Sequence, residues 1–164
     1  MEKTLAIIWY SFTSGSRQLA DAARGGAVEA GGVDVRLLAA EDAESADLLN
    51  ADGYIFVCPE NLAAIAGVMK AFFDRTYYDV LGQIEGRPYA AMICAGSDGS
   101  NAQRQLERIA TGWRLKRVAE TRIVNVKAQT KEEILSPKQI DEAELAEAHV
   151  LGETLAAGLD LGVF

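Results

Sequence analysis

Four short hydroxyl side chains follow directly on an apolar run near the N-terminus. They are Ser11, Thr13, Ser14 and Ser16, with Gly15 between the last two. The apolar run at 5–10 predicts a buried strand, and the spacing of apolar residues after the hydroxyls predicts a helix. Backbone N–H groups at a helix N-terminus, together with hydroxyl groups, form a ready site for a phosphate. The loop therefore predicts a phosphorylated ligand.

The absence of two nucleotide-binding motifs limits which phosphorylated ligands are expected. No GxxxxGK[ST] motif occurs anywhere, and no GxGxxG follows the first apolar run. A hydroxyl-rich loop without a lysine implies a single terminal phosphate, and a tightly held dinucleotide is not expected. Arg17, in the first helical turn, can either add positive charge to the phosphate site or point into solvent, and the sequence leaves both open.

Apolar runs alternate with helical patterns along the chain, as in repeated βα units. Strands are expected at 5–10, 33–38, 53–58, 89–95 and 118–126. Helices are expected at 16–30, around 65–73 and at 100–113, with helical bias at 41–49 and a last helix that starts at Ser136-Pro137 or at Asp141. We predict an α/β fold with three α/β/α layers, a doubly wound five-stranded parallel sheet of order 2-1-3-4-5, and one domain over residues 1–164.

Three loops leave one edge of this predicted sheet, at the point where the winding reverses and ligands bind. The first is the hydroxyl-rich loop. The second is Pro59, Glu60, Asn61 and Leu62, whose proline projects the following backbone outward, where its N–H and C=O groups can meet a planar heterocycle. The third is Gly96, Ser97, Asp98 and Gly99, whose short side chains allow close approach of the backbone to a ring.

Two stretches of sequence resemble a known family. YSFTSGSRQLA is similar to the FMN phosphate loop of the flavodoxin-like superfamily, written roughly (S/T)-x-T-G-x-(S/T). CPENLAAIAGVMKAFFDR resembles the proline loop and following helix of the flavin reductase and quinone reductase branches. The chain departs from the pattern at Ser14, where the family usually has glycine, so the geometry of this loop is in question.

The resemblance implies a flavodoxin-like fold with FMN as its cofactor. Ser11, Thr13, Ser14, Gly15 and Ser16 would hold the phosphate, with Pro59–Leu62 on one side of the isoalloxazine ring and Gly96–Gly99 on the other. Electron-carrier flavodoxins tend to enclose the ring between a tyrosine and a tryptophan from these two loops, and this chain has neither residue there. Phe12, Tyr78 or a partner subunit could supply an aromatic wall instead, and Phe12 is counted among the cofactor-binding residues.

A flavin without aromatic walls has a face open for a nicotinamide or a quinone to stack on it. The first hypothesis is therefore an FMN-dependent oxidoreductase that takes electrons from NAD(P)H, as a transient donor, and passes them to a quinone, a flavin or another small acceptor. The alternative is a flavodoxin-type one-electron carrier to a redox protein. Related reductases commonly form homodimers or homotetramers. A phosphoacceptor receiver domain is excluded, because Ser11-Phe12 and Cys58-Pro59 stand where that class needs acidic residues.

Composition sets outer limits on function. The formal net charge of −8 argues against nucleic acid as a partner. No apolar run approaches the length of about 18 residues that a membrane span needs, so we expect no membrane span and a cytoplasmic protein. Cys58 and Cys94 belong to no CxxC pair or cysteine–histidine cluster, so no metal site is expected and both are interpreted as buried hydrophobic residues. His149 is interpreted as structural or solvent-facing, Trp9 as a sheet-packing residue and Trp113 as an anchor between helix and core.

Overall fold

Five parallel strands form the centre of the fold, in a computed structural model that describes residues 1–164. Their order is β2 (Val33–Ala39), β1 (Lys3–Trp9), β3 (Gly53–Asn61), β5 (Pro88–Ala95) and β6 (Lys116–Arg117). A further strand, β7 (Arg122–Asn125), pairs with the second half of β5. Numbered by the five expected strands this is the order 2-1-3-4-5, so the predicted topology is confirmed.

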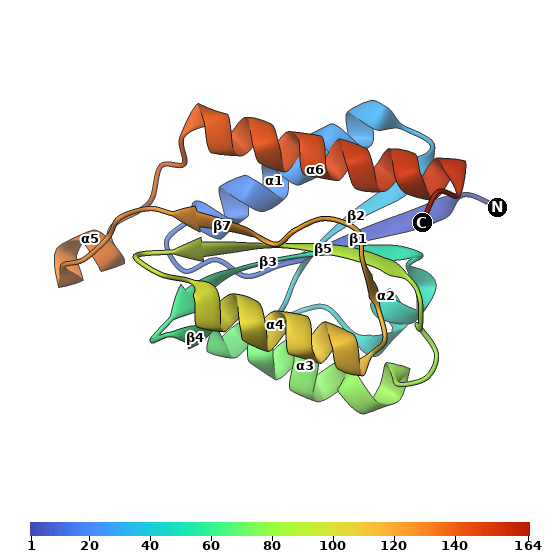
Figure 1. The fold of residues 1–164 in the computed structure, drawn as a ribbon, viewed down its shortest axis with the longest axis horizontal. Helices are drawn as coiled ribbons and strands as arrows, with labels where there is room; N and C mark the ends of the chain where they lie inside the picture. Colours follow the sequence, from blue (N-terminus) through green and yellow to red (C-terminus); the bar gives the residue numbers. More distant parts are fainter.

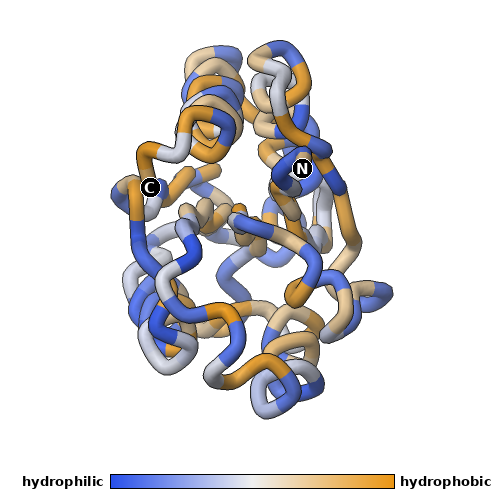
Figure 2. The backbone as a smooth tube through the Cα atoms, turned by 90° about the vertical axis from the view of Figure 1, so that its right-hand side faces the viewer, coloured by the Kyte–Doolittle hydropathy of each residue, from blue (hydrophilic) through white to orange (hydrophobic).

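Helices cover both faces of the sheet and make three layers (Figure 1). α1 (Gly15–Ala30) and α6 (Glu142–Leu161) lie on one face, and α3 (Gly67–Val80) and α4 (Ser100–Gly112) lie on the other, with the short α2 (Ser45–Asn50) beside α3. Figure 2 looks along the strands, with one helix pair on each side of them. β5 is buried throughout and β3 is buried up to Cys58, as expected for strands covered on both faces. No helix is both long and apolar enough to cross a membrane.

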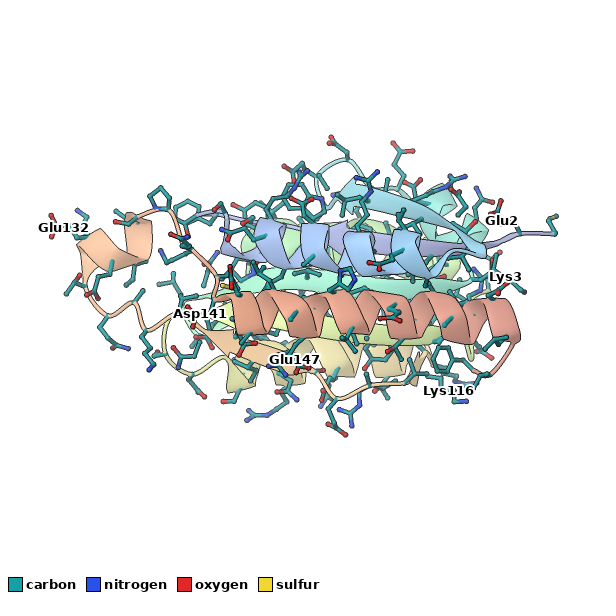
Figure 3. All side chains as sticks on the ribbon, turned by 90° about the horizontal axis from the view of Figure 1, so that it is seen from above. Glu2, Lys3, Lys116, Glu132, Asp141 and Glu147 are labelled. Carbon is teal, nitrogen blue, oxygen red and sulfur yellow. The ribbon has the colours of Figure 1, made fainter.

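α1 and α6 lie side by side over the sheet (Figure 3). Glycines make this close approach possible, since a Cβ on Gly152 would overlap the carbonyl oxygen of Ala23 and one on Gly26 would overlap that of His149. The Nε2 atom of His149 lies 3.0 Å from a carboxylate oxygen of Glu29 across the two helices, and the His149 side chain is 38% exposed. This placement agrees with its interpretation as structural or solvent-facing. The pair of helices brings the start of α1 and the chain entering α6 to the same end of the molecule.

Trp113 confirms its expected role as an anchor between helix and core. Its side chain is fully buried, its indole N–H donates to the carbonyl of Tyr77 at 3.0 Å, and its ring stacks on the Tyr77 ring with 5.6 Å between centroids. This contact ties the end of α4 to α3 on the face opposite α1 and α6.

The edge strand, expected at 118–126, forms instead as two short strands, β6 before that range and β7 within it, and a carboxylate bridges the gap between them. Glu107 on α4 accepts hydrogen bonds from Arg117 on one side of the gap and Thr121 on the other, both at 2.7 Å, and from Gln103 at 3.0 Å. Partial burial would raise the pKa of Glu107, but these hydrogen bonds and the charge of Arg117 outweigh it and lower the pKa below its usual value. The edge strand is thus fastened to α4 through a side chain where its ladder is interrupted.

The loop expected at Pro59–Leu62 is mostly strand, which corrects the prediction. Pro59, Glu60 and Asn61 belong to β3 itself, which turns at Leu62-Ala63 into the two-residue strand β4 (Ala64–Ile65). Ile65 therefore lies before α3 and not in the apolar stripe expected at 65–73. Both turn residues have positive φ, 51° and 61°, as the two central residues of a type I′ hairpin require.

The polar stretch before the last helix also holds more structure than its sequence indicates. Thr130 accepts a hydrogen bond from the backbone of Glu133, whose carboxylate accepts from the Thr130 backbone in return, and this capping box starts α5 (Lys131–Leu135). α5 projects from one end of the molecule (Figure 1). Asp141, the second of the two expected positions, precedes α6.

Candidate functional site

The carboxyl ends of β1, β3 and β5 open into a cavity of about 570 Å³. That volume is typical of a pocket for a small molecule or cofactor. All three predicted loops contribute to its wall. The predicted residues that line it are Phe12 and Thr13 from the first loop, Pro59, Glu60, Asn61 and Leu62 from the second, and Gly96 and Ser97 from the third.

The first loop and the start of α1 lie beside this cavity, and two of their side chains are unusual. The hydroxyl oxygens of Ser11, in the loop, and Ser16, in the first turn of α1, are buried and have no hydrogen-bond partner. Buried polar groups are nearly always paired, so these two hydroxyls point to a ligand that completes them. The residues present therefore fit an anion such as a phosphate.

Ser14 adopts a strained backbone conformation. Its φ of 68° is left-handed, a conformation that glycine adopts most readily, so a serine here costs strain. Gly15 then packs so closely on β5 that a Cβ would lie 2.8 Å from the Cys94 sulfur. Neither residue lines the cavity, nor do Ser11 and Ser16.

The second loop is hydrogen-bonded to the third loop and to α4. The Glu60 carboxylate accepts a hydrogen bond from the backbone N–H of Gly99 at 2.8 Å, and the Asn101 side chain donates to the carbonyl of Ala63 at 2.6 Å. The first bond joins the second loop to the third, and the other joins the hairpin turn to α4. Because β3 continues through this loop, the wall it forms is a β-hairpin.

The third loop contributes less of the cavity than expected. Gly96 and Ser97 line it, whereas the Asp98 carboxylate accepts from the Ser100 hydroxyl at 2.7 Å and lies outside. Gly99, with φ of 83°, is the N-cap of α4 and also lies outside the cavity wall. The sequence S-N-A-Q at 100–103 also suggests a capping box, but none forms, because the Ser100 hydroxyl donates to Asp98 and Gly99 is the N-cap.

A fourth segment, which we did not predict, closes the cavity. Val126 and Ala128 follow β7, and Ile134 and Lys138 belong to α5 and the chain after it. The backbone of Ala128 donates to the carbonyl of Gly96 at 3.0 Å, so this segment packs on the third loop. Topology was an available signal, since the chain after the edge strand must leave from the same edge. The remaining unpredicted lining residues are Tyr10, Ala63, Cys94 and Ala95.

The structure shows where Arg17 and the candidate aromatic wall residues lie relative to the cavity. Arg17 stacks over the Trp9 ring at 4.5 Å and pairs with Asp21 at 3.0 Å, so its charge is engaged away from the cavity. Tyr78 is an exposed residue of α3 and does not line the cavity, so its suggested role as an aromatic wall is wrong. The aromatic side chains of the wall are Tyr10 and Phe12.

The two cysteines are unpaired and buried, as expected. Burial raises the pKa of Cys58 to about 12 and that of Cys94 to about 11. Both thiols are therefore protonated near neutral pH and poor nucleophiles. Cys94 lines the cavity, so what it offers a ligand is an apolar surface and not a reactive group.

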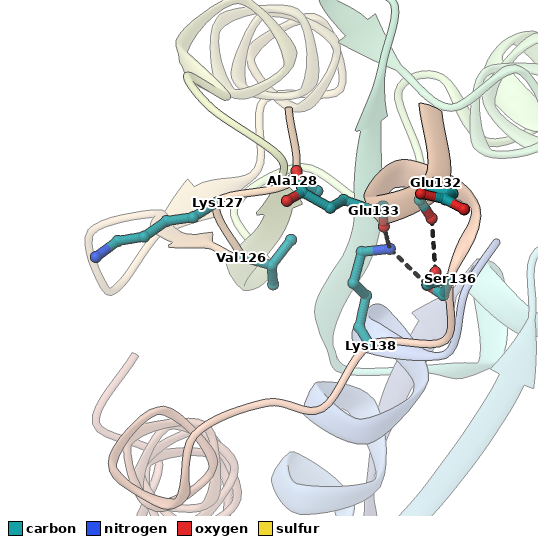
Figure 4. A pocket seen from close by; sticks show the side chains of 7 residues that line it. All are labelled: Val126, Lys127, Ala128, Glu132, Glu133, Ser136 and Lys138. Atoms are coloured by element: carbon teal, nitrogen blue, oxygen red, sulfur yellow. Dashed lines mark hydrogen bonds between the residues drawn. The ribbon is translucent and has the colours of Figure 1, made fainter. Parts of the chain in front are cut away.

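A second, more polar cavity of about 450 Å³ adjoins the first (Figure 4). The two share Val126, Ala128 and Lys138. The other residues that line it are Lys127, Glu132, Glu133 and Ser136. The segment from Val126 to Lys138 thus separates the two cavities.

Comparison with known proteins agrees with this geometry. A family model described as NADPH-dependent FMN reductase matches residues 39–131, which include the second and third loops but not the first. A flavodoxin of Aquifex aeolicus is 31% identical over 93 residues, 57% of this chain and 50% of that protein. The match thus spans half the length of this curated relative.

Solved structures share the fold over nearly the whole chain. A flavodoxin from the domain Archaea has a TM-score of 0.75 at 16% identity, covering 93% of this chain and 96% of that one. The flavodiiron protein from Giardia intestinalis has a TM-score of 0.76 at 15% identity, covering 99% of this chain and 38% of that one. At these identities the likeness establishes the flavodoxin-like fold alone.

Proposed function

The chain belongs to the NADPH-dependent FMN reductase family, and from this we propose that it is an FMN-dependent oxidoreductase. It would take electrons from NADPH or NADH and pass them to a quinone, a free flavin or another small acceptor. Residues 1–164 would act as one FMN-binding domain. The observation that carries the proposal is the pair of buried, unpartnered hydroxyls of Ser11 and Ser16, at a helix N-terminus beside a cofactor-sized cavity.

The residues of the first loop would hold the phosphate. The helix dipole and free N–H groups at the start of α1 attract an anion, and the hydroxyls of Ser11 and Ser16 gain the partners they lack. Thr13, from the same loop, lines the cavity.

The second and third loops would hold the ring. Glu60 and Gly99 join the two loops by a hydrogen bond, so the gap between them is set before a ligand enters. FMN, when bound, supplies the redox chemistry by taking up two electrons from a nicotinamide and releasing them to the acceptor. The protein's part is to orient the ring and leave one face accessible.

A carrier role remains the second candidate function, and one observation favours it. Phe12, Leu62 and Ile134 line the cavity, yet each exposes about half or more of its surface. Such an apolar rim suits docking of a redox protein as well as stacking of a small substrate. The match to a flavodoxin supports the same reading.

The test begins with the purified protein freed of flavin. We expect titration with FMN to quench flavin fluorescence with saturation, and we expect the loaded protein to oxidise NADPH or NADH when a soluble quinone is added. The flavin-free protein serves as the blank. Absence of saturable FMN binding would contradict both candidate functions. FMN binding without nicotinamide oxidation, but with reduction by a redox protein, would favour the carrier.

A further inference from the structure

Lys138 is the one basic side chain in the wall of the larger cavity. The other charged residue there is Glu60, whose carboxylate is bonded to the backbone of Gly99. Arg17, the basic residue next to the first loop in sequence, is held over Trp9 and paired with Asp21. A doubly negative phosphate bound at this loop, in a chain of net charge −8, has no other cation in the cavity wall to balance it.

The backbone of Lys138 is joined to the first loop, although the two lie far apart in sequence. Its N–H donates to the carbonyl of Thr13 at 2.7 Å. Its own carbonyl accepts from the Gln18 side chain at 2.8 Å and from the Ser14 hydroxyl at 3.3 Å. A Cβ placed on Gly15 would lie 3.5 Å from the Cβ of Lys138. The side chain thus starts at the phosphate loop.

No carboxylate neutralises the charge of Lys138. Its ammonium donates to the carbonyl oxygens of Glu133, Ile134 and Ser136 at 2.6, 3.0 and 2.6 Å. The Glu133 carboxylate is occupied by the backbone N–H groups of Gln129 and Thr130, and Lys138 forms no ion pair. Carbonyl dipoles hold the ammonium in place but leave its full charge beside the cavity.

The direction of the side chain can be followed in Figure 4. Lys138 extends toward Glu133 and Ser136, whereas Lys127, on the same segment, extends away from them. The charge of Lys138 also affects Cys94, which lines the cavity, since it partly opposes the burial that raises the pKa of Cys94. Its charge therefore reaches the end of β5, against which the first loop packs.

We infer that Lys138 is the cation that balances the phosphate of the bound flavin and lets the chain distinguish FMN from unphosphorylated riboflavin. This inference rests on the proposed function, because it takes FMN as the ligand. The attraction between ammonium and phosphate acts only on the phosphorylated form, so riboflavin binding should be indifferent to it. Lys138 is then a cofactor-binding residue supplied by a segment outside the three predicted loops.

The experiment compares Lys138→Met, Lys138→Arg and the control Lys127→Met with the wild-type protein. The dissociation constants of FMN and riboflavin are measured by fluorescence quenching on the flavin-free proteins, and their melting temperatures are recorded. We expect Lys138→Met to weaken FMN binding about 10- to 100-fold and to change riboflavin binding less than about twofold. Lys138→Arg and Lys127→Met should bind FMN nearly as the wild type does.

Several outcomes would overturn the inference. Lys138→Met could weaken the binding of FMN and of riboflavin equally. If the melting temperature also falls, the side chain only caps α5; if the melting temperature is unchanged, the side chain acts on the flavin ring. If Lys138→Met binds FMN as tightly as the wild type, the role of Lys138 is contradicted but the proposed function is not. If the wild-type protein binds no FMN, both the role of Lys138 and the proposed function are contradicted.

Discussion

Ser11 and Ser16 carry buried hydroxyl groups that nothing in the protein pairs with. An unsatisfied buried polar group costs about 1–3 kcal/mol, a cost that a protein keeps where a ligand recovers it. Ser16 is 1% exposed, at the second position of a 16-residue helix, so its hydroxyl cannot reach bulk water. The unpaired hydroxyls therefore lower the free energy of unfolding of the ligand-free protein, and ligand binding would restore it.

Ser16→Ala should therefore move stability and binding in opposite directions. We expect the free energy of unfolding without ligand to stay the same or rise by about 1 kcal/mol, because an unpaired hydroxyl is removed. FMN affinity should fall about tenfold, because the phosphate loses one hydrogen bond. Chemical denaturation and fluorescence titration measure the two effects. Ser100→Ala, at the start of α4, is the matched control and should leave FMN binding unchanged.

The outcome that would contradict this interpretation is a less stable Ser16→Ala protein with unaltered FMN affinity. It would mean that the hydroxyl supports the helix and does not face the ligand.

The hairpin at the end of β3 is the element in which strain is most visible. A type I′ turn favours residues such as Asn-Gly, whereas this chain places Leu62 and Ala63 there, both with positive φ. A left-handed conformation costs an ordinary L-residue roughly 1–2 kcal/mol. Leu62 is also fully exposed at the mouth of the cavity. Strained backbone of this kind gathers at functional sites, and here it presents an apolar side chain to whatever approaches the ligand.

The double substitution Leu62→Asn and Ala63→Gly should stabilise the protein by about 1 kcal/mol, because relief of strain exceeds the extra flexibility of glycine in the unfolded chain. Denaturant unfolding of the ligand-free protein measures this. FMN affinity should change less than turnover with NADPH, since the apolar tip is removed while the bond from Gly99 to Glu60 remains. A destabilised variant would show that Leu62 packs in a way its full exposure does not suggest.

At the scale of the whole molecule, four segments spread from Tyr10 to Lys138 meet at one edge of the sheet. They are joined there by hydrogen bonds between segments, such as that from Lys138 to Thr13 and that from Gly99 to Glu60. A ligand bound among them contacts residues that are neighbours only in the folded state. Its binding energy therefore adds to the stability of the entire fold.

FMN at 100 times its dissociation constant should raise the free energy of unfolding by about 2.7 kcal/mol. For a chain of this length that corresponds to an increase in melting temperature of roughly 5–10 °C. Differential scanning calorimetry with and without FMN measures it, and riboflavin at the same concentration shows how much of the effect depends on the phosphate. A melting temperature that is unchanged by saturating FMN would contradict the proposed binding site.

Much of the fold could be predicted because its signals are local. Apolar runs and helical spacing mark β1, β3, β5, α1 and α4, and the order of the five parallel strands follows from the right-handed connections between them. The failures have two causes. Ile65 and α5 follow from short-range pairings that hydrophobic periodicity does not show, a tight hairpin and a capping box, whereas the edge strand is interrupted through contacts with another element, α4. Ile65 leaves the helical stripe because β4 pairs with Glu60 and Asn61, and the edge strand breaks where Glu107 bridges it.

The sequence by itself determined the class of fold, and it predicted a phosphate site in the first loop from hydroxyls that stand after a buried strand and before a helix. Only the tertiary structure decided which residues face the cavity. It placed Arg17 over the Trp9 ring, and it joined Lys138 to Thr13 and Ala128 to Gly96, residues that are far apart in sequence. The physical reason is that a side chain's partners are set by neighbours in space, and those exist only after the strands have been ordered and the helices packed.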